Sequence, residues 1–570
     1  MKATLRNAWK VLLILAFGFL LGKPALAQHP KIAPDLEATD PNSDVDVIIQ
    51  FTQAPTARHH AKVLDRGGQL KGELAIVKGG AYRISARELQ ELADDPEIVH
   101  ISADHSLRGA ATAATLDYYD ATVNAPSAWQ IGLNGTGIGV AIIDSGIFGM
   151  PDLNLNGSST SRVVYSQDFT GLKTTIDQYG HGTHVAGIVG GNGRNSTGSS
   201  YFYTFRGIAP NANLINLRAL DKNGAGTDST VINAIQAAVK LQKIYNIRVI
   251  NLSLGRPVYE SYTLDPLCLA VESAWKAGIV VVVAAGNYGR DNSQGTEGYD
   301  TITAPGNDPY VITVGAMKTT GTPYRGDDII ASYSSKGPSI IDHVVKPDLV
   351  APGNLIISLY TAALTLPSLY PGNEIPYSLY QYNGSSTRSS TYFRLSGTSM
   401  AAPMVSGTAA LMLQQNPLLT PDQIKARLML TASKVFPTSS IATDPVTGQV
   451  FVSYYDIFTV GAGYLDIQAA LNNTDLAAGN ALSPVATHDS TSGNTSLVTD
   501  PKSVWGSKSH WGTTTVWGAT LTSTGTVAGT PAAVWDNTAV QGFQIVWDSK
   551  SKWGTSTTEV ESTSILVNGE

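Results

Sequence analysis

Strand-like and helix-like segments alternate through most of the chain, and this alternation limits the fold more than any other feature. Continuous apolar, β-branched runs such as GVAIID (139–144), RVINLSLG (248–255) and IVVVVAAGN (279–287) are separated by amphipathic stretches such as DSTVINAIQAAVKLQ (228–242). Such runs are typical of parallel strands that are buried on both faces and joined by crossover helices. We therefore predict an α/β domain over residues 113–475, with a mostly parallel central sheet flanked by helices.

A second, smaller pattern precedes this domain. The runs VDVIIQF, QLKGELAIV, AYRIS and EIVHIS alternate with two helical segments in the order βαββαβ. This order predicts a small split-βαβ domain, which we place within residues 28–112. The stretch RGAATAATLD (108–117) follows it, and its small residues are typical of a flexible linker that can be processed.

The first 27 residues predict export. Basic side chains stand before an apolar run, Val11–Leu21, and the small-residue triplet Ala-Leu-Ala ends at residue 27. This is the pattern of a secretory signal peptide over residues 1–27. The apolar run is too short to span a bilayer comfortably. We therefore expect a soluble protein that is secreted to the extracellular space.

The C-terminal region, residues 476–570, is dominated by Ser, Thr and Gly. Six tryptophans recur in it, at positions 505, 511, 517, 535, 547 and 553, and every gap between them is a multiple of six. An even period places each ring on the same face of an extended chain, so we predict a β-rich region with a structural stack of rings. Binding of carbohydrate or a cell surface by these rings is the alternative.

Residues 360–394 interrupt the rhythm of the α/β domain. They are rich in Tyr and Ser and contain several prolines and glycines. Stretches of this length without regular structure are uncommon inside compact domains. We therefore predict a long surface insertion.

Three residues stand where an α/β domain presents functional groups. Asp144 ends the run GVAIID, His181 precedes the small-residue helix in HGTHVAGIVGG, and Ser399 precedes another helical stretch. Sites in such folds lie outside the carboxyl ends of the strands. Taken singly, each residue is more often a turn former or a helix cap. Asp177, His181 and His184 also suggest a metal site, but no HExxH or third-ligand spacing supports it.

The three residue types together suit nucleophilic catalysis. A serine hydroxyl needs a base to take its proton, and a histidine can do this near neutral pH. A carboxylate such as Asp144 fixes the histidine tautomer and stabilises the imidazolium. A helix that starts at about Ser399 would stabilise developing negative charge through its free N–H groups, and Pro403 is then tolerated near its first turn.

Three motifs, VAIIDSGI, HGTHVAG and SGTSMAAP, stand in this order along the chain. Here the sequence resembles the subtilisin-like serine proteases, the subtilase or peptidase S8 family, over residues 117–473. The resemblance implies that Asp144, His181 and Ser399 form the catalytic triad and that Asn287 is an oxyanion donor. Sedolisins share the serine motif but have a glutamate in place of the histidine.

The same resemblance implies how an extended substrate is held. Two segments, 224–226 and 252–255, correspond to the edges that pair with substrate backbone. The implied substrate-binding residues are Gly224, Ala225, Gly226, Ser253, Leu254, Gly255, Ala284, Ala285 and Gly286. The pocket for the residue before the scissile bond is small and apolar, with Thr303 near its base and no evident carboxylate. We therefore expect broad cleavage after apolar or aromatic residues.

The resemblance also implies that residues 28–112 are an inhibitory propeptide, and that no cofactor is required for the chemistry. Members of the family often bind calcium. Asp152 approximates one family ligand position, but the loop NGRNSTGSS departs from the usual pattern. Whether the protein binds a structural calcium ion therefore stays open, and we predict no set of ligands for it.

We accordingly expect a secreted serine endopeptidase, made as a self-processing zymogen, that acts as a monomer on protein or peptide substrates. The net charge of −7 comes without a basic run, which argues against nucleic acid as a partner. The alternative is a surface-binding or adhesion protein whose protease domain mainly serves maturation. An inactive relative that acts as a binding module is a third hypothesis, which the intact triad disfavours.

Overall fold

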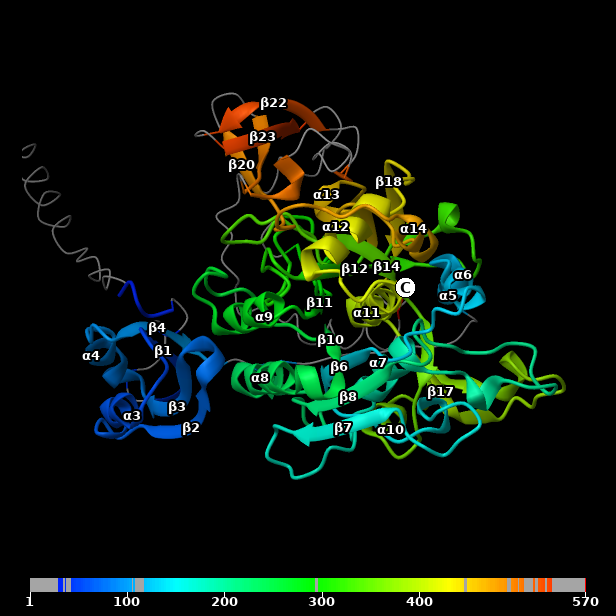
Figure 1. The fold of residues 1–570 in the computed structure, drawn as a ribbon, viewed down its shortest axis with the longest axis horizontal. Helices are drawn as coiled ribbons and strands as arrows, with labels where there is room; N and C mark the ends of the chain where they lie inside the picture. The colour runs from blue at the N-terminus through cyan, green and yellow to red at the C-terminus, as the bar shows by residue number, and fades with distance from the viewer. Residues whose placement is uncertain are drawn as a thin grey trace, which may run out of the picture.

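The computed structural model is drawn in Figure 1. It describes residues 29–33, 36, 41, 43–104, 106–107, 117–292, 296–444, 448–489, 494–500, 502–506, 516–517, 521–527, 530–535 and 569–570. Within these ranges, no helix is both long and apolar enough to cross a membrane. The expected signal peptide and most of the expected linker lie outside the described residues.

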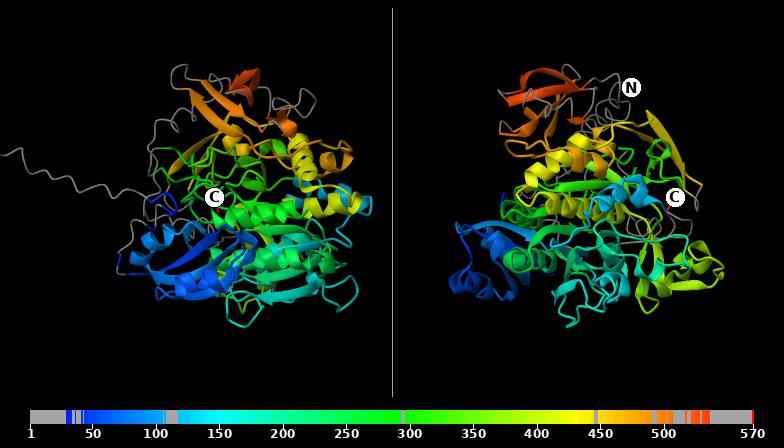
Figure 2. Two further views of the ribbon diagram at one scale, coloured as in Figure 1. Left: turned by 60° about the vertical axis from the view of Figure 1, so that its left-hand side comes forward. Right: turned by 45° about the vertical axis from the view of Figure 1, so that its right-hand side comes forward.

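The N-terminal domain has the predicted βαββαβ order. Its elements are β1 Asp44–Phe51, α3 Ala57–Leu64, β2 Gln69–Leu74, β3 Gly79–Ser85, α4 Leu89–Ala93 and β4 Ile98–Ala103. The strands form an antiparallel sheet in the order β2-β3-β1-β4. Alternate residues of β1 face different cores: Val47 and Ile49 pack inside this domain, whereas Ile48 joins the core of the large domain. Figure 2 shows the domain in blue, beside the large one.

The large domain is built on the predicted central sheet. Its strands are β6 Gly139–Asp144, β7 Val163–Asp168, β8 Asn213–Arg218, β10 Ile247–Leu252, β11 Val280–Ala284, β12 Ile312–Lys318, β13 Ile329–Ile330 and β14 Leu349–Pro352. They lie in the order β13-β12-β11-β10-β6-β8-β7, with β14 beside β12. Every pairing is parallel except that of β13. The apolar run Val280–Val283 is buried on both faces, as its sequence predicts.

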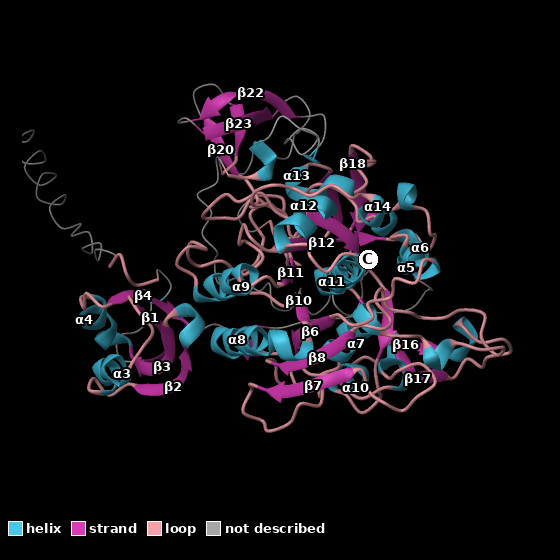
Figure 3. Ribbon diagram, viewed as in Figure 1, coloured by secondary structure: helices cyan, strands magenta, loops and turns pink. Residues whose placement is uncertain are grey.

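Helices cover both faces of this sheet (Figure 3). On one side lie α8 Asp228–Tyr245 and α9 Pro266–Lys276, which also contact the N-terminal domain. On the other side α7 His181–Gly190 packs against α11 Thr398–Gln415, and α11 contacts β10, β11 and β12. The two helices that begin at or just before the predicted base and nucleophile therefore lie together. The remaining helices are α5 Tyr119–Thr122, α6 Ala125–Gln130, α10 Thr365–Leu369, α12 Pro421–Thr431, α13 Ile457–Val460 and α14 Ile467–Asn472.

Smaller sheets complete the described chain. The strands are β5 Ser106–Leu107 with β9 Gly226–Thr227; β15 Ile356–Leu359, β16 Glu374–Pro376 and β17 Arg388–Leu395; β18 Ser439–Thr443 with β19 Val450–Tyr454; and β20 Val485–Asp489, β21 Asn494–Val498, β22 Leu521–Val527 and β23 Thr530–Trp535. The last four form one antiparallel sheet, β20-β21-β23-β22, so the C-terminal region is β-rich as predicted.

The prediction of a surface insertion over residues 360–394 is only partly right, because many of these residues are exposed but others form regular structure with a buried core. This segment supplies α10, β16 and most of β17, and its tyrosines are buried at Tyr360, Tyr380 and Tyr392. The hydroxyl of Tyr380 donates to Ser389 Oγ at 3.0 Å, and that of Tyr392 contacts Asp152 Oδ1 at 2.9 Å. Because these hydroxyls find partners, the rings form an aromatic core although the sequence looks polar.

Of the tryptophans of the repeat that the structure describes, Trp535 lies in strand β23, but Trp505 and Trp517 do not lie in strands, contrary to the prediction. Trp505 lies in a 3-10 turn, Val504–Gly506, and Trp517 is helical, so neither ring stands on an extended strand. The two rings pack edge to face with centroids 5.0 Å apart, and both are buried in a core that includes Phe458. They are therefore not available to bind a surface or a sugar. Trp511, Trp547 and Trp553 lie outside the described residues.

Residues on both sides of the expected boundary at 475 pack together. Ser483 Oγ donates to Asp348 Oδ1 at 2.6 Å and accepts from Lys425 Nζ at 2.8 Å. Trp505 donates its indole N–H to the Leu482 carbonyl at 2.8 Å. The start of the C-terminal region is thus continuous with the large domain, and the domain boundaries stay predictions.

Candidate active site

Asp144 and His181 form a buried pair at the carboxyl edge of the sheet. Asp144 ends β6, and His181 is the first residue of α7. The Asp144 carboxylate accepts from the Ser145 N–H at 2.7 Å, and its Oδ1 lies 2.8 Å from His181 Nδ1. Both side chains are fully buried. A carboxylate at Nδ1 places the proton there and leaves Nε2 as a proton acceptor.

Asp177 builds the turn that positions His181. Its Oδ1 accepts from the Ser145 hydroxyl at 2.9 Å and from the Gly180 N–H at 2.8 Å, and its Oδ2 accepts from the Thr183 N–H at 2.8 Å. Gly180, at φ 113°, occupies a conformation that favours glycine. Burial raises the pKa of Asp177. The sequence presented Asp177 only as a metal ligand, and its place in this turn was missed.

His181 is held ready to take a proton. Its Nε2 is buried and has no hydrogen-bond partner among the described residues. Burial opposes the charged imidazolium, but the charge of Asp144 and its hydrogen bond outweigh burial, and the pKa of His181 is raised above the usual histidine value. A base with this pKa is neutral, and so active, on the alkaline side of its titration.

His184 is turned away from this pair. Its Nε2 lies 3.1 Å from both the Ile356 and the Phe393 carbonyl oxygens. Burial lowers the pKa of His184 to about 3, so the ring is neutral and its Nε2–H donates to these carbonyls of β15 and β17. Asp177, His181 and His184 therefore do not converge on a common point. In the described ranges, no three His, Cys, Asp or Glu side chains gather as metal ligands would.

Ser399 is the second residue of α11, close to the predicted helix start. Gly397 precedes the helix at φ 143°, and its N–H donates to the Gly353 carbonyl at 2.8 Å. The Ser399 hydroxyl donates to the Ser253 carbonyl at 3.1 Å, and not to His181. Catalytic hydrogen bonds often form only when substrate is present, so a rotation of this hydroxyl is required before proton transfer.

Pro403 does not lie in the first turn of α11, contrary to our expectation. It stands five residues after Thr398, inside the helix. A proline there removes the donor that would serve the carbonyl four residues earlier, which is that of Ser399. The Ser253 hydroxyl donates to this carbonyl instead, at 2.7 Å. The helix tolerates Pro403 because Ser253 satisfies the freed carbonyl.

Ser253 thus supports the nucleophile and is not part of a pocket wall. Its side chain is fully buried, and its Oγ accepts from Asn251 Nδ2 at 2.9 Å. Asn251 Oδ1 accepts in turn from the hydroxyl of Ser406 at 2.8 Å, about two helical turns beyond Ser399. This chain of hydrogen bonds ties β10 to α11 and fixes the position of Ser399.

Asn287 is oriented as an amide donor beside the start of α11. It follows β11, and its Oδ1 accepts from the Thr398 N–H at 2.9 Å and from the Thr398 hydroxyl at 3.1 Å. Because Oδ1 is committed to these donors, the Nδ2 group is left to donate elsewhere. Among the described residues it makes no hydrogen bond. An amide fixed in this way can serve a developing oxyanion near Ser399.

A small pocket opens beside Ser399. Its lining residues are Leu254, Gly255, Ala284, Gly286, Asn287, Tyr288, Thr303, Thr398 and Ser399. None of these described residues is charged. Of the predicted wall residues, Leu254, Gly255, Ala284 and Gly286 line the pocket, whereas Ser253 and Ala285 are fully buried behind it. Tyr288 and Thr398 were missed, since neither carries a signal beyond its adjacency to Asn287 and Ser399.

The predicted edge at residues 224–226 is paired with another strand. Gly226 lies in β9, which pairs antiparallel with β5, so that Leu107 stands opposite Gly226. Gly224, at φ 75°, lies so close to the Tyr179 ring that a side chain would collide with it. The segment therefore presents backbone to an extended chain, and residues just after the N-terminal domain occupy that position.

Asp152 does not fit a calcium site. Its Oδ1 is 2.9 Å from the Tyr392 hydroxyl, and its Oδ2 accepts from the Asn195 N–H at 3.2 Å. Burial raises its pKa to about 6. Calcium takes about six to eight oxygen ligands, of which carboxylates are the strongest. A single buried carboxylate held by neutral donors does not supply such a set, and calcium elsewhere stays a prediction.

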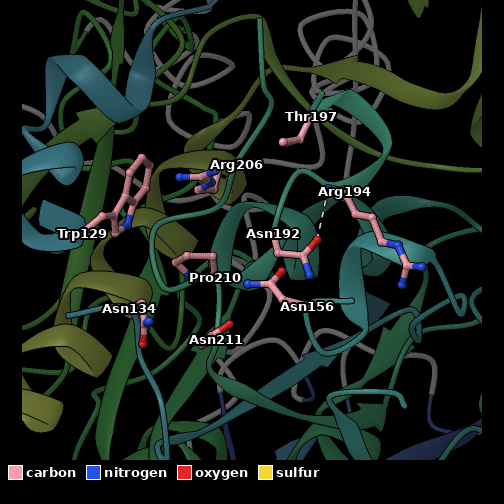
Figure 4. Close-up of a pocket in the computed structure, with 9 residues that line it drawn as sticks. All are labelled: Trp129, Asn134, Asn156, Asn192, Arg194, Thr197, Arg206, Pro210 and Asn211. Carbon is pink, nitrogen blue, oxygen red and sulfur yellow. Dashed lines mark hydrogen bonds between the residues drawn. The ribbon is translucent and has the colours of Figure 1, made fainter. Parts of the chain in front are cut away.

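Figure 4 shows a second pocket, which offers no catalytic groups. Its lining residues are Trp129, Asn134, Asn156, Asn192, Arg194, Thr197, Arg206, Pro210 and Asn211. Arg206 lies over the Trp129 ring, with its guanidinium carbon 5.1 Å from the ring centroid. None of these residues is a carboxylate, histidine or cysteine that could act as base or nucleophile. The candidate active site is therefore the pocket at Ser399.

Comparisons with known proteins show which family the chain resembles. The model of the subtilase family matches residues 135–453. The serine protease AprX of Bacillus subtilis is 41% identical over 306 residues, which span 52% of this chain and 61% of AprX. Subtilisin E of the same species is 32% identical over 393 residues, 68% of this chain and 84% of its own length.

The fold has a solved counterpart. Fervidolysin from Fervidobacterium pennivorans, described as a keratinolytic enzyme related to subtilisin, superposes with a TM-score of 0.57 at 20% identity. The superposition covers 83% of this chain and 68% of that one. At this identity the likeness concerns the fold, whereas the family model and subtilisin E establish the relationship in sequence. The chain belongs to the subtilase family of serine peptidases.

Proposed function

We propose that this protein is a secreted serine endopeptidase in which Ser399 is the nucleophile, His181 the general base and Asp144 its orienting carboxylate. The observation that carries the proposal is the buried Asp144–His181 pair, whose Nε2 is left without a partner beside α11. The Asp144 carboxylate faces Nδ1 and raises the pKa of His181, whereas burial lowers the pKa of His184 and keeps that ring neutral. Hydrolysis of casein by the purified mature protein, blocked by a serine-directed inhibitor, tests it.

The chemical steps follow from these positions. His181 Nε2 takes the Ser399 proton as Oγ attacks the scissile carbonyl, and Asp144 stabilises the imidazolium. Asn287 Nδ2 and the Ser399 N–H donate to the oxygen that becomes negative. His181 then returns the proton to the leaving amine, which gives an acyl-enzyme. Water, deprotonated by the same nitrogen, releases the product acid and restores Ser399.

Synthesis as a zymogen is part of the proposal. The pairing of β5 with β9 fills one of the two edges expected to hold substrate. Asp104 anchors the chain just before β5, because its carboxylate accepts from the Ser229 N–H at 2.9 Å and the Ser229 hydroxyl at 2.6 Å, at the start of α8. The N-terminal domain therefore blocks substrate until the connection between residues 107 and 117 is cut. Removal of residues 28–112 by the enzyme itself would release the site.

Substrate preference is expected to follow the uncharged pocket. Peptides with Phe or Leu before the scissile bond should be cleaved with kcat/KM at least about tenfold higher than the same peptides with Arg or Glu, because the pocket has no charge to pair with theirs. Four chromogenic peptides that differ only at this position provide the measurement. A preference for Arg would contradict the pocket assignment and require an acidic residue not found in its lining.

Asn287→Ala should slow turnover without stopping it. The variant keeps nucleophile and base but loses one donor to the oxyanion, a change worth about 2.7–4 kcal/mol, or roughly 10²–10³ in kcat, in a relative of this family. KM should change little, since the donor acts mainly in the transition state. Thr303→Ala, in the same pocket but away from the oxyanion, is the matched control. Equal kcat values for Asn287→Ala and the wild type would remove Asn287 from this role.

A further inference from the structure

Gly569 and Glu570 occupy a buried site on the large domain. The Glu570 side chain is fully buried, and its Oε1 accepts from the Ser332 N–H at 2.8 Å. Its Oε2 accepts from the Ser332 hydroxyl and, at 2.8 Å, from Arg290 Nη2. The backbone is held as well: Asn354 Nδ2 donates to the Glu570 carbonyl at 3.1 Å, and Asn354 Oδ1 accepts from the Glu570 N–H at 3.2 Å.

The site is specific for a carboxylate. Arg290 is 2% exposed, and its Nε donates to Ser332 Oγ at 2.7 Å, which fixes the direction of its guanidinium. Arg290 also pairs with Asp444 and lies over the Phe451 ring, 4.8 Å from the centroid. A buried guanidinium, a hydroxyl and a backbone N–H that converge on two oxygens match a carboxylate better than any neutral side chain.

The neighbouring position is specific for glycine. Gly569 has φ 56°, a conformation that side chains rarely adopt. A Cβ there would lie 2.7 Å from Leu355 Cδ2 and 2.8 Å from Ser396 Oγ. The cradle formed by Arg290, Ser332, Asn354, Leu355 and Ser396 thus recognises two adjacent residues. It selects Gly569 because it has no side chain, and Glu570 because its side chain is charged.

This cradle adjoins the backbone that carries the candidate catalytic groups. Arg290 stands three residues after Asn287 in the same loop, and Ser396 stands three residues before Ser399. Asn354 follows Gly353, whose carbonyl accepts from the N–H of Gly397 at the start of α11. A ligand in the cradle therefore stabilises the loops from which the oxyanion donor and the nucleophile extend.

We propose that Arg290, Ser332 and Asn354 form a docking site for a Gly-Glu peptide segment, which in this chain is its own Gly569–Glu570. By occupying the site, the segment holds the end of the C-terminal region on the large domain and buries the Arg290 charge. The proposal does not rest on peptidase activity, because none of the contacts that hold Glu570 involves a triad side chain. A Gly-Glu segment of another polypeptide would compete for the same site.

A peptide-binding experiment tests the proposal. The host is the otherwise full chain carrying Ser399→Ala, with or without Gly569 and Glu570, and the probe is the hexapeptide ILVNGE, residues 565–570. We expect the peptide to bind the chain that lacks the two residues and not the chain that retains them, in titration calorimetry. The matched controls ILVNGQ and ILVNAE should bind at least about tenfold more weakly, as expected for loss of a charge-assisted hydrogen bond or of the glycine conformation.

A second measurement keeps the test decisive if the shortened chain does not fold. Hydrogen exchange at the Ser332 amide should be faster in the full chain with Glu570→Ala than in the parent chain, because that amide donates to Glu570 Oε1. Exchange at amides of β10 should stay the same and serves as the internal control. Equal exchange at Ser332, or equal binding of the three peptides, would overturn the proposal.

Discussion

Replacing Ser399 by alanine is expected to reduce kcat by roughly 10⁶-fold, the loss found when the nucleophile of such a triad is removed. The substitution removes one oxygen and little volume, so the chain should fold and be exported. Because self-processing needs the same nucleophile, this variant should accumulate as a precursor that still carries residues 28–112. Intact-mass measurement of the secreted protein, beside casein hydrolysis, gives both readouts.

Thr408→Ala is a useful control for this variant. It removes a buried hydroxyl from the same helix, one that bonds only the Met404 carbonyl of that helix and stands apart from the proposed chemistry. It should lower stability modestly and leave maturation complete. If purified Ser399→Ala, kept away from other proteases, lost its N-terminal domain at the wild-type rate, Ser399 would not be the nucleophile of maturation.

Asp144→Asn is expected to lower kcat by about 10⁴-fold while the fold is retained. An amide at this position can donate its own N–H toward His181 Nδ1, which favours the tautomer with its proton on Nε2, where the proton acceptor is needed. Loss of the negative charge also removes the main cause of the raised His181 pKa. The residual activity should therefore rise with pH through a pKa that is lower than in the wild type.

Profiles of kcat/KM against pH for the two proteins measure this shift. Asp168→Asn offers the same chemical change at the end of strand β7, which is separated from β6 by β8, and there the carboxylate caps a turn by accepting from the Thr170 N–H. That control should keep both rate and pH profile close to the wild type. An unchanged profile for Asp144→Asn would show that Asp144 does not set the ionisation of His181.

The sequence predicted the structure best where a single physical requirement decides the structure of a segment. Runs such as 280–283 must be buried on both faces, and that requirement alone predicts a parallel sheet. The positions of Asp144, His181 and Ser399 followed from strand ends and helix starts, and the first two meet at 2.8 Å. The βαββαβ order of the N-terminal domain could also be predicted from the sequence, because hydrophobic alternation marks each of its strands.

Errors arose where distant residues decide the structure. Tyr360, Tyr380 and Tyr392 look like surface residues until the partners of their hydroxyls are known, and the Asp152 partner of Tyr392 lies far away in sequence. An even spacing of Trp505 and Trp517 predicts a strand face only if the chain between them is extended, and tertiary packing of the rings overrides that pattern.

Pro403 shows that local sequence patterns also fail to predict distant contacts within the site itself. A local rule places a proline in the first turn of a helix, whereas Ser253, from another strand, satisfies the carbonyl that the proline frees. The Arg290 cradle for Glu570 joins residues that no local pattern connects. Both are long-range contacts, so only the folded chain reveals them.

The central claim is that Ser399 Oγ, activated by His181, is the nucleophile, and a site-specific covalent label tests it most directly. Phenylmethanesulfonyl fluoride transfers its sulfonyl group to an activated serine oxygen with loss of fluoride. After incubation of the mature protein with this reagent, peptide mass mapping should locate one adduct at Ser399, in proportion to the activity lost. His181→Ala should form no adduct under the same conditions. Loss of activity with the adduct on another residue, or equal labelling of Ser399 in His181→Ala, would contradict the account.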